Sequence, residues 1–127
     1  KPEYCVELPS ITAGEDTPVH ALLRSASRPT AIVVSDDILA LTLERICTET
    51  GLSIPADLSI LSFNNSLFAR LTSPQLTSID INSCQLGIEA AAQMISHIEN
   101  PELPATKILV PHQLIERDSC ARPVSHS

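Results

Sequence analysis

Three polar residues follow shortly after two of the apolar runs in the sequence. Asp36 and Asp37 follow the run 31–34, and Asn64 follows the run 58–63. Carboxylate and amide groups can exchange hydrogen bonds with the hydroxyl groups of a small molecule. Because two adjacent residues do not readily face one substrate together, the pattern favours binding of a polar ligand over acid–base catalysis.

Asp37 also has a purely structural explanation. Leucines and isoleucines recur at helical spacing from Ile38 to Thr50, and Gly51 supplies a stop. Aspartate is a preferred residue at the N-cap of a helix. We therefore predict that Asp37 caps the helix 38–50, which leaves Asp36 to project into a crevice.

The elements that position these residues alternate between strand and helix, as in a mostly parallel α/β sheet. Further strands are predicted at 3–8, 76–81 and 107–117, and further helices from near Asp16 or Thr17 to before Arg28 and from Asn82, with Gln85 in a capping box, to Ile98. Residues 64–75 are expected to be a connection. Small-molecule sites in open α/β sheets lie outside the carboxyl ends of the strands. Asp36 and Asn64 are therefore expected to meet at that edge.

Composition excludes several classes of function. The net charge is −7 and no Lys/Arg cluster exists, so this piece is not expected to bind nucleic acid. No apolar run approaches the ~18 residues of a membrane span. Three glycines do not make a phosphate-cradling loop, and neither a nucleophile–base set nor a metal-ligand spacing is visible. The sequence predicts no enzyme activity, no metal and no cofactor.

The four cysteines allow two interpretations. Cys5, Cys47, Cys84 and Cys120 lie far apart in the sequence. Buried free thiols in a reducing compartment are the first interpretation. A Cys5–Cys120 disulfide in an exported protein is the alternative.

The helix 38–50 carries a second apolar feature. Ile38, Leu41 and Arg45 share a stripe roughly opposite its core-facing residues. An apolar pair on the outer face predicts a covering partner, either another element or a second subunit.

With these pieces in view, the sequence resembles the LacI/GalR family of bacterial transcription regulators. The matching segments are 28–32, 35–41, 51–60, 62–65, 73–79, the helix from Leu86-Gly87 onward, and 114–119. Each motif is short, and their shared order and spacing make the match specific. The sequence does not begin with Met, and we expect it to be a fragment of a longer protein.

The resemblance implies an α/β fold, a parallel-sheet, Rossmann-like lobe of a periplasmic-binding-protein-like (type I) domain. Residues 1–118 would form most of the C-terminal lobe and 119–127 a polar tail, with the DNA-binding head and most of the N-terminal lobe absent. A cytoplasmic regulator would bind operator DNA only through that absent head. The alternative is a lobe of an exported solute-binding protein.

The resemblance also implies roles for individual residues. Asp36, Asn64 and Ile81 correspond to positions that reach a sugar or nucleoside effector between the lobes. The family commonly has Asn in place of Asp36, Asp in place of Asn64 and a polar residue in place of Ile81. Asp37 matches the family's helix-starting aspartate. A homodimer interface is implied for Ile38, Leu41, Leu71 and Thr72.

Overall fold

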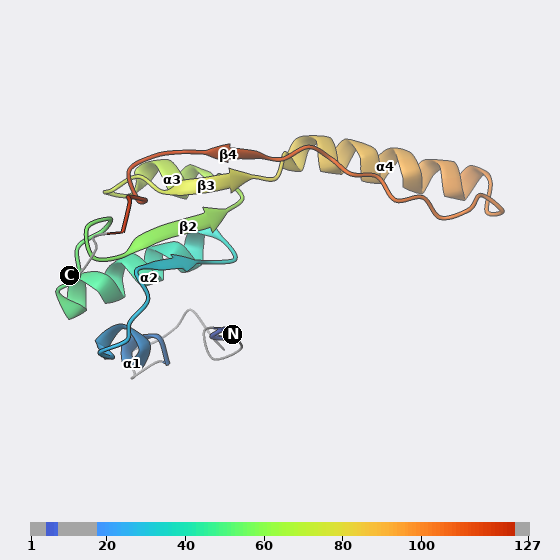
Figure 1. The fold of residues 1–127 in the computed structure, drawn as a ribbon. Helices are drawn as coiled ribbons and strands as arrows, with labels where there is room; N and C mark the ends of the chain where they lie inside the picture. The colour runs from blue at the N-terminus through green and yellow to red at the C-terminus, as the bar shows by residue number, and fades with distance from the viewer. Residues whose placement is uncertain (1–4, 8–17, 124–127) are drawn as a thin grey trace.

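A four-stranded sheet organises the chain, of which the computed structural model describes residues 5–7 and 18–123 (Figure 1). The strands are β1 (Ala31–Val33), β2 (Ser59–Phe63), β3 (Thr77–Asp80) and β4 (Gln113–Ile115), in that spatial order. The first three run parallel, and β4 pairs antiparallel with β3. The predicted α/β class with a mostly parallel sheet is confirmed.

Four helices accompany the sheet: α1 (Pro18–Arg24), α2 (Asp37–Thr50), α3 (Leu67–Leu71) and α4 (Ser83–Glu99). Gly51 ends α2 in the left-handed conformation at φ 74°, as its position predicted. Residues 64–75 were expected to be a connection between strands, and this connection contains the short helix α3. Five residues are too few for an apolar period of 3.6 to show in the sequence.

Both ends of the chain differ from expectation. Residues 5–7 are not in a strand, and the rest of the predicted strand 3–8 lies outside the described residues. The predicted polar tail begins with Ser119, which is fully buried. Its carbonyl accepts a hydrogen bond from the backbone N–H of Ile60 at 2.9 Å, and its hydroxyl donates to the Ile60 carbonyl at 2.6 Å. Ser119 is therefore part of the sheet's packing, and the tail prediction is wrong at its start.

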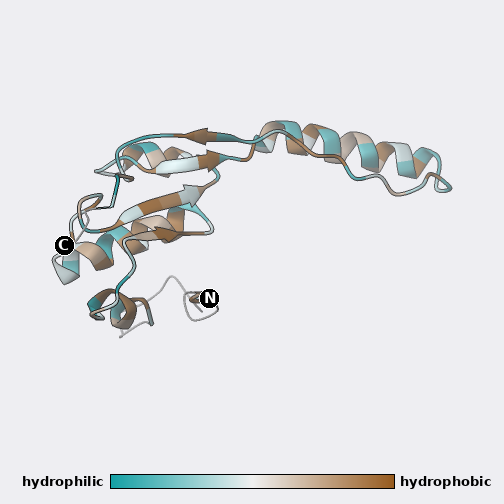
Figure 2. Ribbon diagram, in the orientation of Figure 1, coloured by the Kyte–Doolittle hydropathy of each residue, from teal (hydrophilic) through white to brown (hydrophobic). Residues whose placement is uncertain are grey.

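The hydrophobic core lies between α2 and the sheet. Its most deeply buried large side chains are Ile46, Leu58, Ile60 and Leu76. Apolar residues concentrate along β2 and α2 in Figure 2. The short helix α1 adds Val19 and Leu23 to this core. Burying these side chains is the main source of stability, at roughly 25 cal/mol per Å² of apolar surface.

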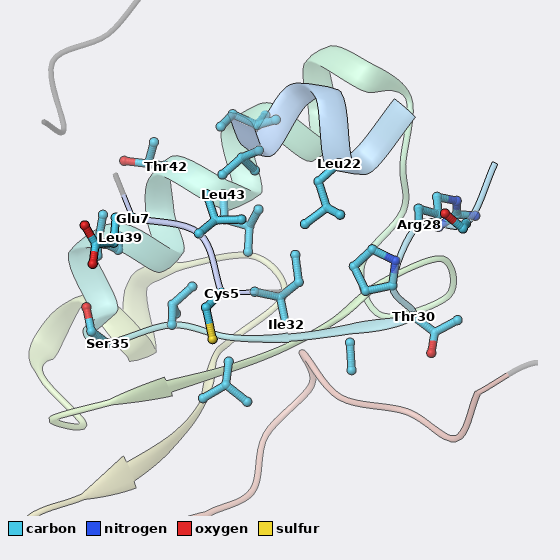
Figure 3. A pocket seen from close by; sticks show the side chains of 18 residues that line it. Cys5, Glu7, Leu22, Arg28, Thr30, Ile32, Ser35, Leu39, Thr42 and Leu43 are labelled. Atoms are coloured by element: carbon cyan, nitrogen blue, oxygen red, sulfur yellow. The ribbon is translucent and has the colours of Figure 1, made fainter. Parts of the chain in front are cut away.

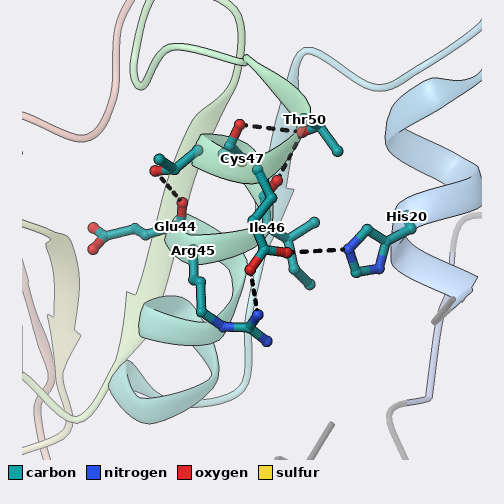
Figure 4. A network of polar contacts seen from close by, with 8 residues as sticks. His20, Glu44, Arg45, Ile46, Cys47 and Thr50 are labelled. Carbon is teal, nitrogen blue, oxygen red and sulfur yellow. Dashed lines mark hydrogen bonds and ion pairs between the residues drawn. The ribbon is translucent and has the colours of Figure 1, made fainter. Parts of the chain in front are cut away.

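A polar contact also joins α1 to α2 (Figure 4). His20 Nε2 lies 3.6 Å from Glu49 Oε2, and Arg45 Nη1 donates to Glu49 Oε1 at 2.5 Å. The Thr50 hydroxyl donates to the Ile46 carbonyl at 2.8 Å within the last turn. Only the His20–Glu49 pair connects α1 to the C-terminal half of α2, and the other two contacts lie within α2.

Helix α4 projects away from the sheet, and the chain returns alongside it to β4 (Figure 1). Among its residues, all of which the structure describes, none is buried. The exposed apolar side chains on it are Leu86, Ile88, Met94, Ile95 and Ile98. The amphipathic helix predicted here exists, but nothing in the described residues covers its apolar face.

The capping box predicted for α4 is wrong. Asn82 precedes the helix in a left-handed conformation at φ 54°, and its side chain caps no backbone N–H. A left-handed residue cannot place its side chain over the first turn as an extended N-cap residue does. Gln85 instead donates to Glu89 Oε1 at 2.8 Å.

No helix in the described ranges is both long and apolar enough to span a membrane. The cysteines within those ranges form no disulfide. Only Cys47 is buried, while Cys5, Cys84 and Cys120 are exposed. The prediction of buried thiols therefore holds for Cys47 alone.

Candidate ligand-binding site

The three candidate ligand residues lie at one edge of the sheet. Asp36, Asn64 and Ile81 follow β1, β2 and β3, and because these strands are parallel and adjacent their carboxyl ends coincide. The backbone N–H of Asn64 donates to the Ile79 carbonyl at 2.9 Å, which fixes Asn64 beside the end of β3. Asn64 has φ 92° and an exposed side chain, whereas Ile81 is half-buried. The edge therefore offers an amide and an aliphatic side chain beside a carboxylate.

Asp36, not Asp37, is the N-cap of α2. Its backbone is extended at φ −159°, and its Oδ1 accepts a hydrogen bond from the Leu39 N–H at 2.8 Å. The prediction for Asp37 is wrong because the helix begins one residue earlier than its apolar period suggested. The other carboxylate oxygen of Asp36, Oδ2, lies 3.4 Å from the Ser35 hydroxyl. Asp36 can therefore cap the helix and still present one oxygen at the edge.

Asp37 is a buried structural hub with only 2% of its surface exposed. Its Oδ1 accepts hydrogen bonds from the Ser62 hydroxyl at 2.5 Å and the Ser78 hydroxyl at 2.9 Å. Its Oδ2 accepts from the backbone N–H of Ser66 at 2.6 Å. One carboxylate thus joins the start of α2 to β2, β3 and the start of α3.

These hydrogen bonds decide the charge of Asp37. Burial by itself would raise the pKa of this carboxyl group. Hydrogen bonds from Ser62, Ser66 and Ser78 favour the ionised form and together bring the pKa below its usual value. Asp37 is therefore a buried carboxylate at neutral pH, held by donors rather than by a cation.

A second polar group joins the turn after β2 to the end of β3 and to Arg117, which follows β4. The Asn65 amide donates to Asp80 Oδ2 at 2.9 Å and accepts from Arg117 Nη2 at 2.5 Å. Asp80 Oδ1 accepts from the backbone N–H of Asn82 at 2.8 Å. The Asn65 and Asn82 hydrogen bonds lower the pKa of the Asp80 carboxyl group. The sheet edge thus carries a fixed, charged network behind the ligand-facing residues.

The sequence interpretation missed this network and the serines around Asp37. Ser62 and Ser78 interrupt runs that otherwise read as buried strands, and both are fully buried. A polar side chain at a buried strand position requires a hydrogen-bond partner. That requirement was the available signal for Ser62 and Ser78, whereas nothing near Arg117 in the sequence identifies Asn65 as its partner.

A cavity of about 1200 Å³ lies on the other side of β1, between residues 5–7, α1 and α2 (Figure 3). Aliphatic side chains such as Ile32, Leu39 and Leu43 form most of its wall. Its Arg28 is engaged elsewhere, since Nη1 donates to the Asp57 carbonyl at 2.8 Å. Among the described lining residues, Ser35 hydrogen-bonds to Asp36 at the polar edge. The edge at Asp36 and Asn64 is the better candidate for a polar ligand.

The predicted interface residues lie on α2 and at α3, which pack against each other. Ile38 and Leu71 are 45% and 70% exposed, while Leu41 and Thr72 are half-buried. Leu67 and Phe68 of α3 are also exposed and were not predicted. Helix α3 therefore presents three large apolar side chains to solvent, and the neighbouring α2 adds Ile38.

Comparisons with known proteins agree with this architecture. The family model for the periplasmic-binding-protein-like domain matches residues 3–120. The chain belongs to that family. The LacI/GalR resemblance is thereby confirmed at the level of the domain, and its relatives place the chain with the effector-binding domains of LacI/GalR regulators.

Two curated relatives and one solved structure illustrate the likeness. The HTH-type transcriptional repressor PurR of Pectobacterium carotovorum subsp. carotovorum (strain PC1) is 35% identical over 103 residues, which cover 81% of this chain and 30% of that protein. The NTD biosynthesis operon regulator NtdR of Bacillus subtilis (strain 168) is 32% identical over 101 residues, 79% of this chain and 31% of that protein. These relatives are transcriptional regulators, not enzymes.

The solved structure is a LacI family transcriptional regulator from Enterococcus faecalis V583 with bound ribose. It aligns with a TM-score of 0.74 at 34% identity and covers 84% of this chain and 39% of that chain. The present chain spans about 30% of the length of the curated relatives named here. The family domain is therefore shared, while the rest of those proteins lies outside the sequence described.

Proposed function

We propose that this chain is the effector-sensing and dimerisation part of a LacI-type DNA-binding transcriptional regulator. The observation that carries the proposal is the convergence of Asp36 and Asn64 at the carboxyl edge of a parallel sheet in a chain of this family. Effector binding would stabilise one arrangement of the lobes, and the dimer would pass that change to DNA-binding heads. The named relatives are regulators, which favours this function over an exported solute-binding lobe.

The proposed ligand is a small polyhydroxylated molecule of the sugar or nucleoside class, bound between two lobes. Asp36 offers a carboxylate oxygen and Asn64 offers an amide that both donates and accepts, a combination suited to vicinal hydroxyl groups. Ile81 adds an aliphatic contact for the carbon face of a ring. The ribose held by the Enterococcus faecalis regulator is a ligand of this chemical class.

The proposed protein is larger than this chain. Residues 1–118 would contribute most of one lobe. The buried side chain of Ser119 supports extending that unit past residue 118. The exposed apolar face of α4 supports the presence of further chain that covers it. Operator DNA would be bound by a separate N-terminal domain, because this chain carries a net charge of −7 and DNA binding needs a basic surface. The protein would act in the cytoplasm.

We also propose that the full-length protein is a homodimer. Ile38, Leu41, Leu71 and Thr72 would form the contact in this lobe, extended by Leu67 and Phe68. The exposed side chains of Leu67, Phe68 and Leu71 on α3 lie near that of Ile38 on the neighbouring α2, which is more than the scattered exposure expected of a monomer's surface.

Calorimetric titration of the full-length protein tests the ligand class. The probes are ribose first, then a panel of other pentoses, hexoses and nucleosides, with Glu99→Ala, a remote exposed carboxylate on α4, as the control variant. We expect at least one panel member to bind, and Asn64→Ala to weaken that binding while Glu99→Ala does not. Failure of every panel member to bind would contradict the proposed ligand class.

A further inference from the structure

Within the described residues, helix α4 connects to the sheet through β3 and β4. The chain leaves the sheet at the end of β3, runs through α4, and returns into β4 (Figure 1). β3 and β4 pair antiparallel, with Asp80 opposite Gln113 and Ser78 opposite Ile115. Motion of α4 relative to the sheet therefore acts on this strand pair.

One side chain joins the end of β3, next to α4, to a residue that follows β4. Asn65 belongs to the turn after β2, yet its amide donates to Asp80 at the end of β3 and accepts from Arg117 beyond β4. Arg117 is anchored in turn, since its Nη1 donates to the Leu76 carbonyl at 2.6 Å and its backbone N–H donates to the Thr77 hydroxyl oxygen at 3.0 Å. Three separate segments meet at the Asn65 amide.

The chemistry of this position suits an amide and not a carboxylate. An amide presents a donor to the anion of Asp80 and an acceptor to the cation of Arg117 at the same time. A carboxylate at position 65 would keep the contact with Arg117 but would oppose Asp80.

The backbone of Asn65 is also fixed in place. It adopts φ 46°, a conformation that Asn and Asp tolerate better than other side chains. Its N–H donates to the Ser78 hydroxyl at 3.0 Å, and that hydroxyl donates to Asp37. The amide is thus held rigidly between its two charged partners, and it connects them to the start of α2.

We propose that Asn65 is a clasp that holds β3 and β4 together and so limits the movement of α4 relative to the sheet. Asp80 and Arg117 are the two groups it joins, and Asn82, whose N–H donates to Asp80, transmits the restraint to the first turn of α4. This device goes beyond effector binding and stands on the described contacts alone.

An exchange of donor and acceptor tests the clasp. Asn65→Asp removes the donor to Asp80, and Asp80→Asn leaves one carbonyl oxygen where two carboxylate oxygens accepted hydrogen bonds. The double variant N65D/D80N restores complementarity, because the amide placed at position 80 can donate to the carboxylate placed at position 65, which still accepts from Arg117. Hydrogen exchange of the full-length proteins, measured by mass spectrometry on peptides, reports each segment separately.

We expect N65D to speed exchange about tenfold in segments 80–86 and 112–117, and D80N to do so to a smaller degree. Exchange in β1 and in the second half of α2 should not change, and the double variant should return toward the wild-type rates. Equal acceleration in all segments, or no rescue in the double variant, would overturn the proposal. Should N65D fail to fold, D80N decides alone, and wild-type exchange at 80–86 in D80N would contradict the clasp.

Discussion

Ser62 donates a hydrogen bond to Asp37 at 2.5 Å, although the two residues are 25 positions apart and both are buried. Ser78 and the backbone of Ser66 complete the set of donors to the same carboxylate. The start of α2, which carries the polar edge, therefore keeps its position through one buried charge.

Removing that charge should destabilise the fold strongly. Asp37→Ala leaves the buried hydroxyls of Ser62 and Ser78 and the N–H of Ser66 without their acceptor, and we expect a loss of about 3 kcal/mol in the free energy of unfolding. Urea denaturation followed by circular dichroism measures it. Ser35→Ala, which alters an exposed neighbour, is the control and should change stability by less than about 0.5 kcal/mol. A loss of less than about 0.5 kcal/mol in the free energy of unfolding of Asp37→Ala would contradict the role of Asp37 as a hub.

Two variants of Asp36 should distinguish its role as a helix cap from the role of its carboxylate in ligand binding. Asp36→Ala loses the acceptor for the Leu39 N–H and should cost about 1 kcal/mol of stability. Asp36→Ser keeps a capping hydroxyl but removes the carboxylate, so it should retain the melting temperature of the wild type. Differential scanning calorimetry of the two variants tests this, and equal losses for both would show that the hydroxyl does not replace the cap.

Glu44 should make stability fall as the pH rises toward neutrality. Burial raises the pKa of this carboxyl group to about 7 from its ordinary 4.5. Its Oε1 is buried with no hydrogen-bond partner in the described part of the chain, and in Figure 4 the side chain points away from His20. Between these two pH values the folded protein keeps a proton that the unfolded chain has released, so stability is greatest below pH 4.5 and declines up to about pH 7.

Glu44→Gln isolates that contribution. The variant should lack the decline and should be more stable than the wild type at pH 8 by about 1 kcal/mol, a value reduced for partial solvent screening. Urea denaturation midpoints at pH 5 and pH 8 measure the difference between the two proteins. A wild-type protein whose decline between these pH values equals that of Glu44→Gln would contradict the assignment.

The outer surface of α2 and α3 should carry the dimer contact. Leu41→Glu and Leu71→Glu place charges in the proposed apolar interface, and each should convert the full-length dimer into a monomer. Multi-angle light scattering gives the mass. Ala56→Glu, at an exposed turn beyond the other end of α2, is the matched control and should remain dimeric. Dimers of unchanged mass in both leucine variants would place the interface elsewhere.

Much of the fold follows from local patterns, and the site does not. The strand near 31–34, the body of the helix from Ile38 to Thr50 and the stop at Gly51 were predictable because apolar period and glycine chemistry are local signals. Helix α3 was not predictable, because it is only five residues long and the packing of Ala69 in the core sets its position. The extent of order at Ser119 depends on hydrogen bonds to Ile60, 59 positions away.

The roles of the two aspartates show the same limit. Either could start α2 by its chemistry, and only the buried serines on neighbouring strands decide that Asp37 turns inward. Helix α4 was predicted from its amphipathic pattern, yet the pattern could not say that its apolar face would have no cover among the described residues.

A double-mutant cycle on effector binding tests the central claim most directly. The affinities of the wild type, Asp36→Ser, Asn64→Ser and the double variant would be measured by calorimetry with the panel member that binds. Because both side chains are proposed to hold one ligand, we predict that each single variant loses at least about tenfold in affinity. The loss of affinity in the double variant should be smaller than the product of the two single losses. Unchanged affinity in either single variant would contradict the proposed site.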